Sequence, residues 1–66
     1  MQITLNGKVH EAASATTLAE LLGELGRRAQ PVAVEVNGKL VPRNRHPSHI
    51  LHAGDRVEVV TLVGGG

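Results

Sequence analysis

The chain has 66 residues, a formal net charge of +1, and no cysteine, phenylalanine, tyrosine or tryptophan. A chain of this length forms one small domain, for which we expect a stability of about 3–10 kcal/mol. Without cysteine there is no disulfide, no thiol nucleophile and no cysteine-based metal site. The small net charge and the lack of aromatic side chains argue against nucleic-acid binding, and no apolar run is long enough to span a membrane. We therefore expect a cytoplasmic protein with an aliphatic core.

A β-hairpin is predicted at the start of the chain. Residues 1–5 alternate apolar and polar side chains, and residues 8–13 provide the returning strand. Between them lies Asn6-Gly7, a preferred two-residue hairpin turn.

A short amphipathic helix is predicted next. Thr17 and Glu20 have the spacing of a capping box, with Thr17 as the N-cap. Gly26 is placed to end the helix. One apolar stripe lies between these signals and is formed by Leu18, Leu21, Leu22 and Leu25.

The second half of the chain predicts three more strands. Residues 32–36 and 39–41 form a second hairpin around Asn37-Gly38, and residues 56–63 form the last strand. The element order is therefore ββ-α-ββ-β. A lone helix must pack its leucine stripe on one face of a mixed sheet, here of four to five strands, so the fold class is α+β. The ubiquitin-like β-grasp fits this order best.

The glycines at the end of the chain are the strongest functional signal. We expect a domain at residues 1–63 and a flexible tail formed by Gly64, Gly65 and Gly66. Glycine buries no side chain and is costly to order, so such a tail has no packing role. Three extended residues carry the terminal carboxylate roughly 10 Å from the domain, which suits insertion into a narrow channel of another protein. The alternative is a frayed terminus without a role.

The chain resembles a known family over its whole length. The matching segments are Met1-Gln2-Ile3, Asn6-Gly7, Thr17-Leu18-Ala19-Glu20-Leu21-Leu22, Val34-Glu35-Val36-Asn37, Leu40-Val41-Pro42-Arg43, Gly54-Asp55-Arg56-Val57-Glu58 and the glycine end. In these segments the chain is similar to the ThiS-type sulfur carrier proteins of thiamine biosynthesis, a ubiquitin-like β-grasp family. That family usually ends in two glycines, whereas this chain has three.

The resemblance implies a carrier and not an enzyme. It implies that the carboxylate of Gly66, or of Gly65 if the last residue is trimmed, attacks the α-phosphate of ATP on a ubiquitin-activating-type adenylyltransferase (ThiF-type). A persulfide donor then supplies sulfur, leaving a C-terminal thiocarboxylate that passes its sulfur to a thiazole synthase (ThiG-type). No cofactor is bound by the carrier, because ATP and magnesium are supplied through the activating enzyme.

Strand alternation predicts where these partners dock. If Val57 and Val59 face the helix, Val60 and Leu62 lie on the opposite face as exposed apolar residues. We expect Val60 and Leu62, with Leu40 beside them, to contact both partner enzymes. The alternative is a bulge or register change that buries them. Arg43 is expected to add a basic contact to a partner, although an ordinary solvated loop explains it equally well.

Three histidines lie three residues apart in the polar loop before the last strand. His46, His49 and His52 would suit a nitrogen ligand set if the loop were helical, but Pro47 interrupts the segment. Solvated loop histidines are the simpler interpretation, so no metal site is predicted.

Two other functions remain open beside the sulfur carrier. A ubiquitin-like modifier would use the same adenylated glycine to form isopeptide bonds with lysines. The small subunit of molybdopterin synthase is a related sulfur donor, but that family is usually longer and has aromatic residues before its glycine pair. The short length and the Val41-Pro42-Arg43 segment favour the sulfur carrier.

Overall fold

The computed structural model describes residues 1–27 and 30–62. Its elements follow the predicted order, with a 3-10 turn added before the last strand. They are β1 (Gln2–Leu5), β2 (Lys8–Glu11), α1 (Leu18–Glu24), β3 (Val32–Val36), β4 (Lys39–Val41), η1 (Arg43–Arg45) and β5 (Arg56–Thr61).

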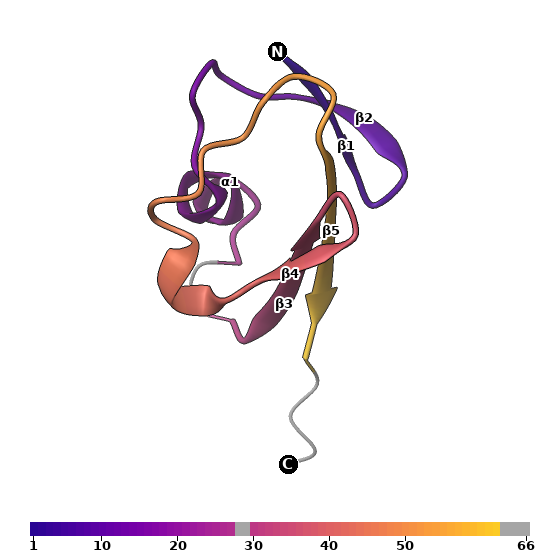
Figure 1. The fold of residues 1–66 in the computed structure, drawn as a ribbon. Helices are drawn as coiled ribbons and strands as arrows, with labels where there is room; N and C mark the ends of the chain where they lie inside the picture. The colour runs from indigo at the N-terminus through magenta and orange to yellow at the C-terminus, as the bar shows by residue number, and fades with distance from the viewer. Residues whose placement is uncertain (28–29, 63–66) are drawn as a thin grey trace.

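The five strands form one mixed sheet in the order β2-β1-β5-β3-β4. The two central neighbours, β1 and β5, run parallel, and every other pair is antiparallel. Helix α1 lies on one side of this sheet, and the other side carries no helix in the described part of the chain (Figure 1). The α+β class and the β-grasp arrangement predicted from the sequence are thereby confirmed, with five strands rather than four.

Both Asn-Gly pairs form the predicted hairpin turns. Asn6 and Asn37 have φ angles of 49° and 53°, and the glycine after each is also at positive φ. Positive φ at both central residues gives the type I′ turn, whose twist matches that of the flanking strands. Local backbone preference at these two pairs therefore predicts the position of both hairpins.

The capping box of α1 forms as predicted. The Glu20 amide donates to Thr17 Oγ1 over 3.1 Å, and the Thr17 amide donates to Glu20 Oε1 over 3.0 Å. The Thr17 hydroxyl also donates to Glu20 Oε1 over 3.1 Å. The bond from the Thr17 amide, and after it the bond from the Thr17 hydroxyl, lower the pKa of Glu20 below its usual 4.5. At the other end Gly26 has a φ of 72°, the left-handed conformation typical of the residue after a helix C-cap.

The loop between β4 and β5 completes the cap of α1, which the sequence did not predict. The Leu18 amide donates to the His49 carbonyl over 3.0 Å, and the Ala19 amide donates to the His46 carbonyl over 3.1 Å. These two amides have no partner within the helix, so the loop satisfies donors that would otherwise need water. Leu51 from the same loop is buried in the core.

The core lies between α1 and the inner face of the sheet. It contains only aliphatic side chains, as the composition requires, and its members are Ile3, Ala12, Leu18, Leu21, Leu22, Val34, Val36, Val41, Leu51, Val57 and Val59. Leu25, which was predicted to belong to the helical stripe, is only partly buried at the edge of this cluster. No helix in the described part of the chain is both long and apolar enough to cross a lipid bilayer.

Candidate docking face

The last strand presents different side chains to the two sides of the sheet. Val57 and Val59 are 1% and 9% exposed and face α1. Val60 and Leu62 are 58% and 50% exposed. The predicted alternation is therefore confirmed, and no bulge buries these two residues. We call the side of the sheet opposite α1 the outer face.

Leu40 lies on the same outer face, two strands away from Val60. It pairs with Glu35 of β3, and Glu35 pairs in turn with Glu58 of β5. Val60 pairs instead with Ala33, which lies two residues before Glu35 on β3. Strand spacings place Leu40 and Val60 about 12 Å apart, so the three predicted apolar residues do not form one continuous patch but lie on two sides of the charged Glu35 and Glu58.

Val9 is a further exposed apolar residue that sequence reasoning did not single out. It is 71% exposed and pairs with Thr4, which pairs with Arg56 on the outer face. Ile3 is buried on the inner face and pairs with His10, so Val9, the residue before His10, points to the outer face. The register of the first hairpin is therefore the signal from which its exposure could have been predicted. Val9 lies at the far edge of the sheet from Leu40.

The end of β5 is held from both sides up to Leu62. Asn6 continues the β1 ladder with its side chain, accepting from the Val59 amide over 2.8 Å and donating to the Val59 carbonyl over 3.3 Å. Arg27 donates to Thr61 Oγ1 over 2.9 Å, and the Leu62 amide donates to the Pro31 carbonyl over 3.0 Å. The predicted tail at residues 64–66, and Val63, lie outside the described residues.

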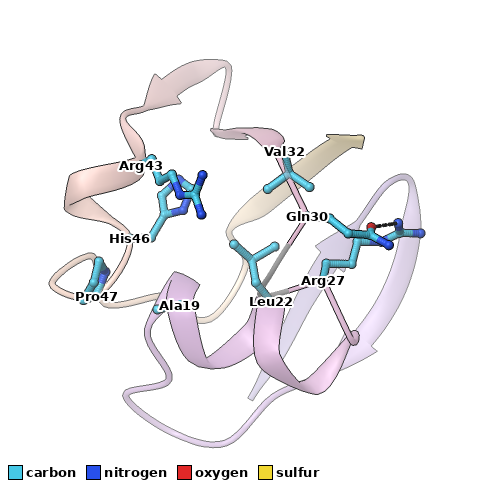
Figure 2. Close-up of a pocket in the computed structure, with 8 residues that line it drawn as sticks. All are labelled: Ala19, Leu22, Arg27, Gln30, Val32, Arg43, His46 and Pro47. Atoms are coloured by element: carbon cyan, nitrogen blue, oxygen red, sulfur yellow. Dashed lines mark hydrogen bonds between the residues drawn. The ribbon is translucent and has the colours of Figure 1, made fainter. Parts of the chain in front are cut away.

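Arg43 does not lie on the outer face. It lines a cavity of 140 Å³ on the helix side of the sheet. Figure 2 shows Arg43 beside His46 on one side of this cavity and Arg27 hydrogen-bonded to Gln30 on the other. Sites for small molecules usually enclose about 300–1,000 Å³, so this space is too small for a nucleotide.

The three loop histidines do not converge. His46 is buried, and its Nε2 lies 3.0 Å from the Val41 carbonyl, whereas His52 is exposed. Within residues 1–27 and 30–62, no three His, Cys, Asp or Glu side chains are grouped closely enough to hold a metal ion. His46 instead closes the loop that caps α1, a structural role that its sequence position did not indicate.

Comparison with known proteins identifies the family of this fold. The description of the family that matches residues 3–66 is "ThiS family". The chain belongs to the ThiS family of sulfur carrier proteins. The resemblance inferred from the sequence is thereby confirmed.

Relatives and solved structures agree with this membership. The sulfur carrier protein ThiS of Escherichia coli is 33% identical over 66 residues, which cover all of both chains. The crystal structure of the thiamine biosynthesis protein ThiS from Geobacter metallireducens is 35% identical, with a TM-score of 0.85 and complete coverage of both chains. A thiazole synthase of Magnetococcus marinus is 44% identical over 66 residues, covering all of this chain. The chain spans only 20% of the length of the curated thiazole synthases that it matches.

Proposed function

We propose that this chain carries sulfur to the thiazole of thiamine as a thiocarboxylate at its C-terminal glycine. Membership of the ThiS family, with a match that extends through residue 66, is the observation that supports this most strongly. The hydrogen bonds along the end of β5 add support, because they hold the described chain in place up to Leu62, shortly before the glycines.

The reaction begins at the Gly66 carboxylate. One carboxylate oxygen attacks the α-phosphate of ATP, forming an acyl-adenylate and releasing pyrophosphate. The terminal sulfur of a persulfide then attacks the acyl carbon and displaces AMP, and a thiol cleaves the resulting acyl disulfide to leave the thiocarboxylate. If residue 66 is removed first, Gly65 takes the same role.

The carrier presents its terminal carboxylate to the activating enzyme and contributes no catalytic group. ATP and magnesium bind to the ThiF-type adenylyltransferase, so the chain itself holds no cofactor. Delivery of one carboxylate on a thin tail raises its effective concentration at the phosphate, and glycine avoids side-chain collisions in a narrow channel. Because the proposed reaction consumes ATP and persulfide sulfur, we propose that this chain acts in the cytoplasm.

A ThiG-type thiazole synthase is the proposed acceptor of the sulfur. The support is the presence of a similar 66-residue region within proteins named thiazole synthase. In those proteins a carrier-like region and a synthase share one chain, which would keep donor and acceptor at high effective concentration. We propose the same pairing of carrier and synthase for this chain.

The outer face provides the proposed contact with both enzymes. Val60 and Leu62 are exposed apolar residues immediately before the tail, and Leu40 lies on the same face. A partner that covers them gains the burial of apolar surface while it receives the tail. Arg43 remains a separate predicted contact, on the helix side.

Intact mass spectrometry tests the proposed chemistry. The chain is incubated with its ThiF-type enzyme, Mg-ATP and a persulfide source. We expect a mass gain equal to the replacement of one oxygen by sulfur, and no gain in a variant that lacks Gly66. A gain that appears only after conversion to a Gly65 end would instead assign the reactive carboxylate to Gly65. No gain, or attachment of the chain to lysines of other proteins, would contradict the carrier and favour a modifier.

A single substitution tests the docking contact. Leu62→Glu places a charge in the proposed apolar contact but leaves the fold intact, because Leu62 is half exposed and outside the core. We expect ATP–pyrophosphate exchange by the activating enzyme to fall to background. Ala13→Glu, an exposed position outside the outer face, is the control and should retain full exchange. Full exchange by Leu62→Glu would remove Leu62 from the contact.

A further inference from the structure

The centre of the outer face holds two carboxylates in direct opposition. Glu35 of β3 and Glu58 of β5 are register partners in an antiparallel pair, and both are exposed. The side chains on either side of them along each strand, such as Val34 and Val59, are buried on the inner face. Both carboxylates therefore point away from α1, with Cβ atoms about 5 Å apart.

No residue in the described part of the chain forms an ion pair with these two carboxylates. Neither carboxylate makes an ion pair or a hydrogen bond with another described residue, and the ion pair within the described residues joins the N-terminus to Glu11. Arg56 shares the outer face two residues before Glu58, yet forms no ion pair with it. Like charges directly opposite on neighbouring strands are unfavourable, so we expect the pair to cost the free carrier some stability that a partner's cation would offset.

Apolar side chains lie on two sides of the pair. Leu40 is the register partner of Glu35 on β4, and Val60 lies two residues after Glu58 on the same face of β5. Of the five large apolar side chains that are exposed in the described residues, four lie on the outer face: Val9, Leu40, Val60 and Leu62. An apolar surface beside the tail is suited to protein contact, and its acidic centre determines which charge the partner must present.

We propose that the outer face binds a protein surface that carries an arginine or lysine against Glu35 and Glu58, flanked by apolar side chains. This proposal rests on the proposed function and specifies the docking surface of the activating enzyme. A guanidinium is the best match, since its planar fork can donate to two neighbouring carboxylates at once. Binding would relieve the repulsion within the carrier as well as form new ion pairs.

The negative charge of Glu35 and Glu58 does not reflect the composition of the whole chain. The whole chain has a formal net charge of +1, so this pair of carboxylates, neither of which forms an ion pair with a described residue, has the sign opposite to that of the chain as a whole. They also disfavour nucleic acid as the occupant of this face, because phosphates would be repelled. The observations therefore favour a basic and partly apolar protein surface.

The test compares the wild-type chain with the double variant Glu35→Gln/Glu58→Gln. Glu24→Gln is the control, because it also removes an exposed carboxylate but lies on α1, on the other side of the sheet. ATP–pyrophosphate exchange by the ThiF-type enzyme is measured at low salt and at about 1 M salt, where the screening length falls to about 3 Å. Urea unfolding of each free carrier is measured in parallel.

We expect the double variant to raise the KM for the carrier at least about tenfold at low salt, with little change in kcat, as for loss of a charged contact. Its KM should depend less on salt than that of the wild type, and its urea midpoint should be higher because the repulsion is gone. Glu24→Gln should match the wild type in both assays. A higher urea midpoint together with a raised KM would show that the variant is folded and has lost docking alone.

Other results would overturn the proposal. A wild-type KM and wild-type salt dependence in the double variant would show that no cation faces the pair, while the proposed function would stand. A lower KM would identify a partner surface without cations and would overturn it as well. Absence of exchange with the wild-type chain would overturn both the proposed function and this inference.

Discussion

The two faces of the sheet differ in what their side chains do, although they are built from the same strands. The inner face is covered by α1 and contributes valines and Ile3 to the core. The outer face exposes Val60, Leu40 and two opposed carboxylates, with no helix over them in the described residues. Successive side chains along a strand point to opposite faces. A residue that stabilises the core is therefore followed directly by one that is available for the proposed partner contact.

This separation means that neighbouring residues should respond differently to substitution. Val59 and Val60 are adjacent and chemically identical, yet one is buried and the other exposed. Changes on the inner face should affect the free energy of unfolding, and changes on the outer face should affect partner binding. Each of the following predictions tests one part of that division.

The largest effect is expected from truncating a leucine on the inner side. Leu21 is fully buried in α1, so Leu21→Ala should lower the free energy of unfolding by about 2–5 kcal/mol through lost burial and a cavity. Leu40→Ala, the same change on the outer face, should alter it by no more than about 0.5 kcal/mol. Urea denaturation of both variants measures the contrast. Equal losses would show that Leu40 is packed in the folded protein and is not a free contact surface.

A smaller loss is expected where Asn6 ties the first hairpin to β5. Asn6→Ala removes both side-chain hydrogen bonds to Val59 and leaves alanine at a φ of 49°. The unsatisfied Val59 groups and the left-handed backbone together should cost about 1–3 kcal/mol.

The variant Asn6→Gly separates these two causes. Glycine tolerates the positive φ but also lacks the amide, so its loss of stability in urea denaturation should be smaller than that of alanine and still measurable. If glycine were as stable as asparagine, the bonds to Val59 would contribute nothing.

The smallest effect of the series concerns the cap of α1. Thr17→Ala removes the hydroxyl that accepts from the Glu20 amide and should cost about 1 kcal/mol. The pKa of Glu20 is lowered in the folded state, so its contribution is present above its usual 4.5 and is lost as pH falls through the lower folded value.

Glu20→Gln has no titrating carboxylate at this cap. The difference in stability between the wild-type chain and Glu20→Gln should therefore shrink as pH falls below 4.5, as measured by urea denaturation across that range. A difference that grows toward acid pH would contradict the assigned hydrogen bonds.

Local signals in the sequence predicted much of this structure. Asn37-Gly38 located a hairpin because few residues other than asparagine and glycine tolerate positive φ, and Thr17 with Glu20 located the helix start through hydrogen bonds within one turn. Alternation along the last strand predicted the exposure of Val60 correctly. Each of these signals depends on residues that are close together in the chain.

Features that join distant segments could not be predicted in this way. The burial of His46 and its carbonyl bond to Ala19 depend on how a long loop crosses the start of α1. The opposition of Glu35 and Glu58 depends on the register between two strands separated by a whole hairpin. Arg43 stays a predicted partner contact, but its position beside the cavity on the helix side depends on the path of the loop and could not be predicted from local signals.

The most direct test of the division between faces is a map of amide shifts in the labelled chain when the ThiF-type enzyme and Mg-ATP are added. We predict perturbations at the outer face of β5, β3 and β4, including Val60, Glu35 and Leu40, and at the glycines of residues 64–66. Helix α1 should remain largely unaffected. Perturbations confined to α1, Arg43 and the cavity beside His46 would contradict the account, because they would place the partner on the side that we assign to stability.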